Sequence, residues 1–358
     1  MRFIASLLTL AITHSCFGDQ TATDGRVYSV YFDTSCQMPV FTVSPEYEPV
    51  VNTLQWTVGN APEGLQLIAA IGLLANRFGL SQTQAVDLRN GFGESYEAMN
   101  SDPQCAGLTS ALDEIFATDP ERQGHYFVYV PTEPSVAAPT ILFLHGYGGN
   151  LKYYIWALKE AFPDSVIVAP TWGIGWHDGD VVYVDEVCRN VETHFRISLG
   201  NKWVMGLSAG GPAGFRVMNR KPSDYRGYIC IASGLPQQRA AELSFKEPIL
   251  MLNGINDVRF PIQFVRRGIA EMESHGLCVE QVELDRDHFF LLTQRVETFQ
   301  IIESFIQKHS TVPVNLSSID KPHWILRLFR SWGLYFLGLS ILYLLAIKKL
   351  RGRRKKLL

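Results

Sequence analysis

From residue 125 to residue 308, short apolar runs rich in β-branched residues alternate with longer amphipathic stretches. Runs of this kind predict strands, and the stretches between them have the length of helices. We expect strands at residues 125–130, 140–144, 165–169, 202–207, 227–231, 248–252 and 278–284, and helices at residues 151–161, 182–197, 209–219, 261–275 and 292–308. Strands that alternate with helices form a mainly parallel sheet with helices on both faces, so the sequence predicts an α/β fold over residues 124–310.

The preceding part of the chain, residues 19–123, has a different character. Residues 26–32 (RVYSVYF) predict an edge strand, and helical patterns follow at residues 63–78, 82–99 and 108–117. We expect this part to be a mostly helical extension. It is either a small domain or a cap over the active site, and the sequence is compatible with both.

The first residues predict a secretory signal peptide over residues 1–18. Arg2 precedes an apolar run at residues 3–12, and the small residues Ser15 and Gly18 follow it. A basic start, a short apolar run and small residues at a cleavage site are typical of such a signal. We therefore expect the body of the protein to lie outside the cytoplasm.

The last residues predict a membrane anchor. Residues 331–347 are an uncharged stretch of 17 residues, and residues 348–358 hold seven Lys or Arg. As a helix the stretch is about 25 Å long, at the lower edge of a spanning length. The positive-inside rule keeps the basic tail in the cytoplasm, with residues 311–330 as an external linker. An apolar helix packed on the body and a removable sorting signal remain as alternatives.

The overall charge argues against a nucleic-acid partner. Of 358 residues, 47% are hydrophobic and 19% are charged, which is ordinary for a globular protein. Outside the basic tail, the chain carries 25 Lys and Arg against 35 Asp and Glu. A body this acidic repels phosphate backbones.

The six cysteines predict at most two disulfides. Once Cys16 has left with the signal peptide, five cysteines remain in an oxidising compartment. Cys36 and Cys105 both lie in the N-terminal third and are the expected pair, whereas Cys230 lies in an apolar run and is expected in the core. No Cys or His spacing fits a zinc site, so we expect no metal.

The strand at residues 202–207 runs directly into GLSAGG at residues 206–211, and helical sequence follows. A G-x-S-x-G between a strand and a helix predicts a nucleophile elbow, because the small residues let the chain turn sharply and leave the serine hydroxyl exposed. Ser208 is the expected nucleophile.

A second glycine-rich motif, HGYGG at residues 145–149, follows the earlier strand at residues 140–144. Its glycines permit close approach of the backbone, so we expect the amides of Tyr147 and Ala209 to form an oxyanion hole. We expect His145, which precedes the loop, to be structural.

An acid and a base follow later strands in the order that a Ser-Asp-His triad requires. Asp257 follows the strand at residues 248–252, and His288 follows the strand at residues 278–284. The carboxyl ends of parallel strands share one crevice, which brings both residues close to Ser208. Asp285 and Asp287 flank His288, but adjacent side chains point away from its ring, so Asp257 is the preferred acid.

Over residues 120–310 these motifs resemble the α/β-hydrolase superfamily. GLSAGG, together with DVVYVDEV at residues 180–187, is similar to secreted polyhydroxybutyrate depolymerases and feruloyl esterases. The pattern Gly254, Asp257 and Pro261 is also similar to dienelactone hydrolases and prolyl-oligopeptidase-type peptidases. The latter resemblance implies that the hydroxyl of Tyr147 donates to the oxyanion. Upstream, the chain has no segment long and β-rich enough for the propeller of those peptidases.

Together the motifs and the resemblance predict a membrane-anchored serine hydrolase that acts outside the cytoplasm on small-molecule or polymeric carboxylic esters. Ser208 attacks the carbonyl, His288 transfers the proton, and Asp257 orients the imidazole. No cofactor is expected. Two alternatives remain: a serine peptidase or amidase with the same triad, and a catalytically silent binding module with this fold. The residues set neither the substrate's identity nor the oligomeric state.

Overall fold

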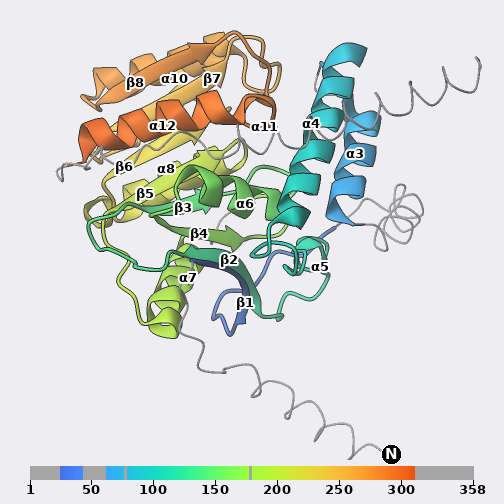
Figure 1. Cartoon of the computed structure of the whole chain (residues 1–358). Helices are drawn as coiled ribbons and strands as arrows, with labels where there is room; N and C mark the ends of the chain where they lie inside the picture. The colour runs from blue at the N-terminus through green and yellow to red at the C-terminus, as the bar shows by residue number, and fades with distance from the viewer. Residues whose placement is uncertain (1–24, 43–61, 76–78, 177–179, 311–358) are drawn as a thin grey trace, which may run out of the picture. The chain divides into compact units, whose positions relative to one another are not determined.

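The computed structural model describes residues 25–42, 62–75, 79–176 and 180–310. Its centre is an eight-stranded sheet with the strand order β1-β2-β4-β3-β5-β6-β7-β8 (Figure 1). Strands β3 to β8 run parallel, whereas β2 is antiparallel to both of its neighbours. The strands are β1 Arg26–Phe32, β2 Gly124–Val130, β3 Thr140–Leu144, β4 Val166–Thr171, β5 Lys202–Leu207, β6 Gly227–Ile231, β7 Ile249–Gly254 and β8 Val279–Leu284.

Helices cover both faces of this sheet, as the alternating pattern predicts. Every residue of β3 (TILFL) and of β6 (GYICI) is buried, which requires a covering layer on each side. One core cluster holds residues of α4 Gln82–Ser101, α6 Lys152–Ala161 and α12 Arg295–His309. The cluster on the opposite face holds residues of α7 Asp180–Phe195, α8 Gly210–Arg220 and α10 Ile262–Ser274. This part of the chain also contains the short helices η2 Pro222–Asp224, α9 Gln237–Ala240 and α11 Phe290–Thr293.

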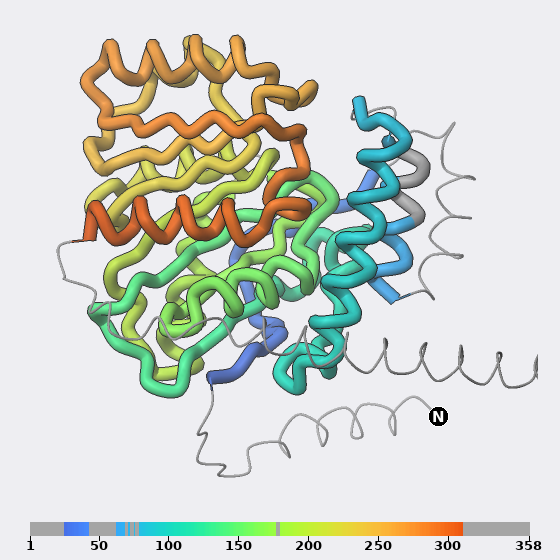
Figure 2. Tube along the Cα trace, turned by 45° about the horizontal axis from the view of Figure 1, so that its top comes forward, coloured from blue at the N-terminus to red at the C-terminus, as the bar shows by residue number. Residues whose placement is uncertain are grey.

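The N-terminal part contributes both to the sheet and to the helical layer. Strand β1 pairs with β2 along its whole length, so the predicted edge strand is confirmed. Helix α3 Glu63–Leu74 packs against α4, which begins with a capping box at Ser81 (Figures 1 and 2). Helix α5 Leu112–Ile115 is shorter than predicted. The described residues form one compact unit that ends at Ser310.

The expected Cys36–Cys105 disulfide is wrong for this structure. Both residues are free thiols, as are Cys188, Cys230 and Cys278. Cys105 is buried in the cluster under α4 and α6, whereas Cys36 packs against the cluster on the opposite face of the sheet. Burial raises the pKa of the Cys105 thiol to about 12. Cys230 is fully buried in β6, as predicted.

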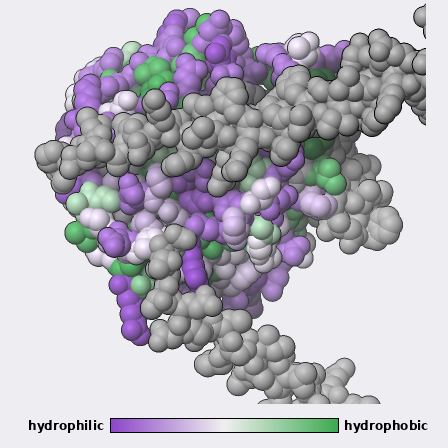
Figure 3. All heavy atoms as spheres, in the orientation of Figure 1, coloured by the Kyte–Doolittle hydropathy of each residue, from purple (hydrophilic) through white to green (hydrophobic). Residues whose placement is uncertain are grey.

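Several predictions fall on residues outside the described ranges. These are the signal peptide at residues 1–18, the linker at residues 311–330, the anchor at residues 331–347 and the basic tail at residues 348–358. Within the described ranges, no helix has both the length and the apolar character needed to cross a bilayer. On the face shown in Figure 3, hydrophobic residues are scattered among mainly hydrophilic ones.

Candidate active site

Ser208 lies in a strained turn between β5 and α8. Its φ angle is +50°, in the left-handed region that residues other than glycine rarely adopt. The backbone amide of Ser208 donates to the carbonyl of Ile231 in β6, with an N–O distance of 2.9 Å, and this bond helps to hold the turn. This strained turn from strand to helix has the backbone geometry that the motif predicts for a nucleophile elbow.

The two outer glycines of the motif are required by close backbone contacts. A Cβ atom at Gly206 would overlap the carbonyl oxygen of Gly210, and a Cβ atom at Gly210 would overlap the carbonyl oxygen of Leu144. Because backbone atoms cannot give way without moving the sheet, even alanine at either position would disturb the turn.

Two polar residues, one just after β6 and one in β7, hold the carbonyl of Ser208 through hydrogen bonds. The hydroxyl of Ser233 donates to the carbonyl of Ser208 at 2.6 Å, and the amide group of Asn253 donates to the carbonyl of Ser233 at 2.8 Å. Both supporting side chains are fully buried. Sequence analysis missed them. The available signal was a polar residue at or just beyond the end of an otherwise apolar strand.

Ser208, His288 and Asp257 form a hydrogen-bonded series. The Ser208 Oγ lies 3.0 Å from His288 Nε2, and His288 Nδ1 lies 2.7 Å from Asp257 Oδ2. The other oxygen of Asp257 accepts the backbone amides of Arg259 and Phe260, at 2.7 and 3.0 Å. The carboxylate thus fixes the proton on Nδ1 and leaves Nε2 to accept the serine proton.

The two other candidate acids are directed elsewhere. Asp285 accepts a hydrogen bond from the side chain of Asn256, and Asp287 accepts the backbone amide two residues further on. The structure therefore brings Asp257, the preferred acid of the three, to the imidazole of His288.

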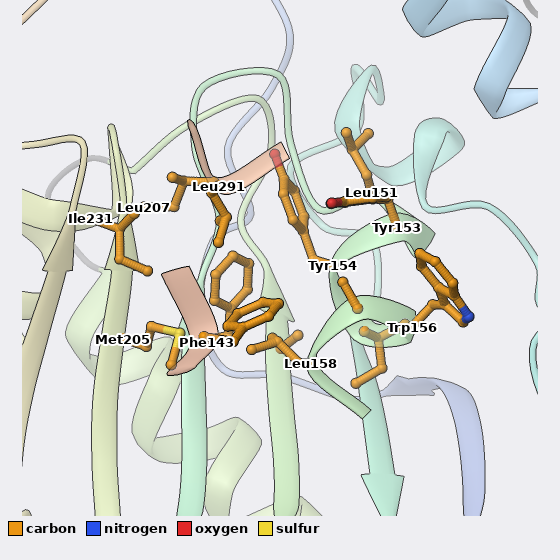
Figure 4. Packing of buried hydrophobic residues seen from close by; sticks show 14 of the residues in the cluster. Phe143, Leu151, Tyr153, Tyr154, Trp156, Leu158, Met205, Leu207, Ile231 and Leu291 are labelled. Carbon is orange, nitrogen blue, oxygen red and sulfur yellow. The ribbon is translucent and has the colours of Figure 1, made fainter. Parts of the chain in front are cut away.

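Ser208 lines a cavity of about 230 Å³, the walls of which are mainly apolar. Figure 4 shows several of the wall residues and their neighbours packed together from β3, β5, α6 and α11. The ring of Phe260 is stacked on the imidazole of His288, with centroids 6.1 Å apart and an interplanar angle of 13°. The lining residues are Gly146, Tyr147, Tyr154, Leu207, Ser208, Ala209, Arg259, Phe260, His288, Phe289, Leu291 and Leu292.

The loop that carries Tyr147 is fixed mainly by backbone contacts. Gly148 and Gly149 have φ angles of +109° and +93°, which glycine adopts without strain. The amide of Gly148 donates to the carbonyl of Ile174 at 2.8 Å, and Asn150 Nδ2 donates to the carbonyl of Ala169 at 2.7 Å. Tyr147 is 73% exposed and borders the cavity together with Ala209. The roles of Tyr147 and Ala209 as oxyanion donors remain predictions.

His145 is a structural residue. Its Nε2 accepts the backbone amide of Trp172 at 3.2 Å, so the ring proton lies on Nδ1, which donates to the carbonyl of Gly146 at 2.8 Å. Burial lowers the pKa of His145 to about 4, and the ring is therefore neutral near pH 7. Within the described part of the chain, no group of three His, Cys, Asp or Glu side chains could hold a metal ion.

Comparison with known proteins gives structural neighbours only. The sequence matches no protein-family model and no curated protein. Similar solved structures include an acylaminoacyl peptidase of Pyrococcus horikoshii (12% identity, TM-score 0.43), a thermostable esterase (16%, 0.42) and a ferulic acid esterase (14%, 0.42). These are the kinds of enzyme that the sequence motifs resemble.

The similarity is limited in extent. The matched regions cover 55%, 53% and 53% of this chain, and 41%, 60% and 94% of the three neighbours. The chain thus spans less than two thirds of the length of the first two. At identities and scores this low, the likeness says nothing about the substrate.

Proposed function

We propose that this protein is a serine hydrolase that cleaves carboxylic esters. The observation that carries the proposal is the hydrogen-bonded series Ser208, His288 and Asp257, which ends at the wall of an apolar cavity. In this mechanism His288 Nε2 takes the proton of Ser208 while Oγ attacks the ester carbonyl. The alcohol leaves with that proton, and the serine keeps the acyl group.

The second half of the reaction repeats these steps with water. His288 takes a proton from a water molecule, whose oxygen attacks the acyl carbon, and then returns the proton to Ser208 Oγ. Each tetrahedral intermediate carries an oxyanion. We assign its stabilisation to the amides of Tyr147 and Ala209, next to the N-terminus of α8, where the helix dipole favours negative charge.

The cavity favours a substrate with a small apolar acyl group. Its volume of about 230 Å³ is below that of a pocket enclosing a drug-sized ligand. The side chains of Leu207, Leu291 and Leu292 contribute apolar surface, whereas Arg259 is the cationic residue among those that line the cavity. A larger alcohol group, or the rest of a polymer, would lie outside the cavity.

The test of this proposal is covalent labelling of the full-length chain with a fluorophosphonate, which reacts with activated serines. We expect one modified peptide, which contains Ser208, and equal labelling of the Ser274→Ala control, whose serine lies at the exposed end of α10. Labelling of another serine would contradict the assignment of Ser208 as the nucleophile, and no labelling of a folded protein would favour the silent binding module. A matched ester and anilide of one acyl group separate the remaining classes: faster ester cleavage supports the proposal, and faster anilide cleavage supports a peptidase or amidase.

We also propose that the body lies outside the cytoplasm, anchored by residues 331–347. The support is the signal-like start at residues 1–18 and the uncharged stretch that precedes seven basic residues. Fractionation of cells that express the full chain or a chain ending at residue 310 tests the anchor. We expect the first in membranes and the second in the soluble fraction, and an equal distribution would contradict the proposal.

A further inference from the structure

A buried carboxylate joins the N-terminal helices to the rest of the molecule. Glu63, the first residue of α3, is only 3% exposed. It accepts hydrogen bonds from the hydroxyl of Tyr96 in α4 (2.5 Å), the hydroxyl of Ser110 (2.7 Å) and the backbone amide of Lys152 (2.8 Å). Burial raises the pKa of Glu63, and the bonds from Tyr96 and Ser110 oppose this shift. One side chain therefore links three separate segments to α3.

The bond to Lys152 lies next to the predicted oxyanion loop. Lys152 is the first residue of α6, two residues after Asn150, which ends that loop. The first amides of a helix have no partner within the helix, and a carboxylate placed there both accepts a hydrogen bond and interacts favourably with the helix dipole. Glu63 thus fixes the point at which the loop enters α6.

A second contact from the same part of the chain reaches the loop itself. Ile115 of α5 packs on Gly149 so closely that a Cβ atom at this glycine would overlap the isoleucine side chain. Gly148 and Gly149 both have positive φ angles and no side chains, so the loop has little stiffness of its own. Its position depends on contacts from outside the loop, which are the packing of Ile115 and the hydrogen bonds of Gly148 and Asn150 described above.

The helical pair also reaches the loop that carries the proposed base. The side chain of Gln84, in the first turn of α4, donates to Asp287 at 3.2 Å, one residue before His288. Helix α4 packs on α6 and α11, which together supply Tyr154, Leu291 and Leu292 to the cavity. In Figure 4, Tyr154 and Tyr153 leave α6 in different directions, and Tyr153 packs on Phe92 of α4.

We infer that Glu63 is a positioning residue for ester hydrolysis, acting through the N-terminus of α6 on the oxyanion loop. The inference rests on the proposed function. It makes the N-terminal helices a support for the catalytic loops: with Glu63 intact, the amide of Tyr147 is held where the oxyanion forms. Without it, the loop relaxes and the transition state loses part of its stabilisation.

The test compares Glu63→Ala and Glu63→Gln in the full-length chain, with kcat and KM for an aryl acetate. Alanine removes all three hydrogen bonds. We expect kcat to fall about 10- to 100-fold, with KM within about threefold of wild type. The loss is smaller than for removal of an oxyanion donor, because the amide of Tyr147 is still present but is displaced. Glutamine retains an oxygen for Tyr96 and Lys152 and can donate to the hydroxyl of Ser110. We expect it to keep kcat within about threefold of wild type.

Glu280→Ala is the matched control. Glu280 is a partly buried carboxylate near the start of β8, at the edge of the sheet opposite to Ser208, and it accepts hydrogen bonds from Lys308 Nζ at 2.7 Å and His309 Nε2 at 2.6 Å. It should lower thermal stability and leave kcat per folded molecule unchanged. If Glu63→Ala does not fold, Lys152→Pro provides the second measurement, because proline is accepted at the first position of a helix but has no amide to donate to Glu63. We expect a reduction in kcat with an unchanged KM.

The outcomes separate this inference from the proposed function. Wild-type kcat in folded Glu63→Ala, or in Lys152→Pro when the former does not fold, would overturn the positioning role while ester hydrolysis stands. A loss in Glu63→Gln as large as that in Glu63→Ala would also overturn it, since the hydrogen bonds would then not be the cause. A wild-type chain that neither cleaves the ester nor reacts with a fluorophosphonate would overturn both.

Discussion

Replacement of Ser208 by alanine is expected to lower kcat/KM for an aryl ester by at least about 10⁴-fold. The reason is that Oγ lies 3.0 Å from His288 Nε2 and, in the proposed mechanism, is the atom that forms the acyl-enzyme. What remains is binding of the ester and stabilisation of the oxyanion by the proposed amide donors, which in enzymes with such a triad leave about 10³- to 10⁴-fold acceleration over water. Steady-state hydrolysis, corrected for the uncatalysed rate, measures the loss.

The Ser208→Ala chain should fold normally, so the loss can be assigned to chemistry. Alanine keeps the Cβ atom, and the contacts that hold the turn come from the backbone of Ser208 to Ile231 and Ser233. A thermal midpoint close to that of wild type is therefore expected. Activity within tenfold of wild type in the folded variant would show that Ser208 is not the nucleophile.

Much of the fold was predictable because its signals are local. The central strands are continuous apolar runs with no polar face, and the helices between them carry one apolar stripe. The elbow was predictable for the same reason: the clash that excludes a side chain at Gly206 involves Gly210, four residues away. For Gly206 the main steric requirement therefore lies within the motif, whereas the requirement for Gly210 comes from the carbonyl of Leu144 in β3.

Contacts between distant segments were not predictable in this way. The bond from Lys152 to Glu63 joins residues 89 positions apart, and nothing near Glu63 in the sequence distinguishes it from a solvated acid at the start of a helix. The Cys36–Cys105 pairing failed for a similar reason. Position along the chain does not determine which face of a sheet a residue joins, and these two thiols belong to opposite faces.

Asp257 could be predicted only from its place after a strand. Its neighbours in the structure explain why it is the carboxylate that faces His288. Asp257 Oδ1 is saturated by two backbone amides, which leaves Oδ2 as the oxygen that faces His288. Asp285 and Asp287 lie closer to the histidine in sequence, but they are directed to other donors. A turn in the backbone, and not distance along the chain, selects the carboxylate.

The same two amides make Asp257→Asn a sharp test of the mechanism. Because the amides of Arg259 and Phe260 need an acceptor, the carboxamide must place its oxygen toward them and its NH₂ group toward His288. Nδ1 of the imidazole then becomes an acceptor, and the ring proton moves to Nε2, where it faces Ser208. That tautomer cannot take the serine proton, so we expect kcat to fall about 10³- to 10⁴-fold with little change in KM.

Asp285→Asn is the matched control for this substitution. It makes the same chemical change in an exposed acid, three residues before His288, that bonds to Asn256, and we expect kcat within about twofold of wild type. Thermal unfolding should show that both variants are folded, since asparagine has the shape of aspartate. Activity above a tenth of wild type in Asp257→Asn would contradict the tautomer argument. A large loss in Asp285→Asn alone would instead identify Asp285 as the acid that orients His288. Only the carboxylate that fixes the proton on Nδ1 should have this effect when it is replaced by an amide.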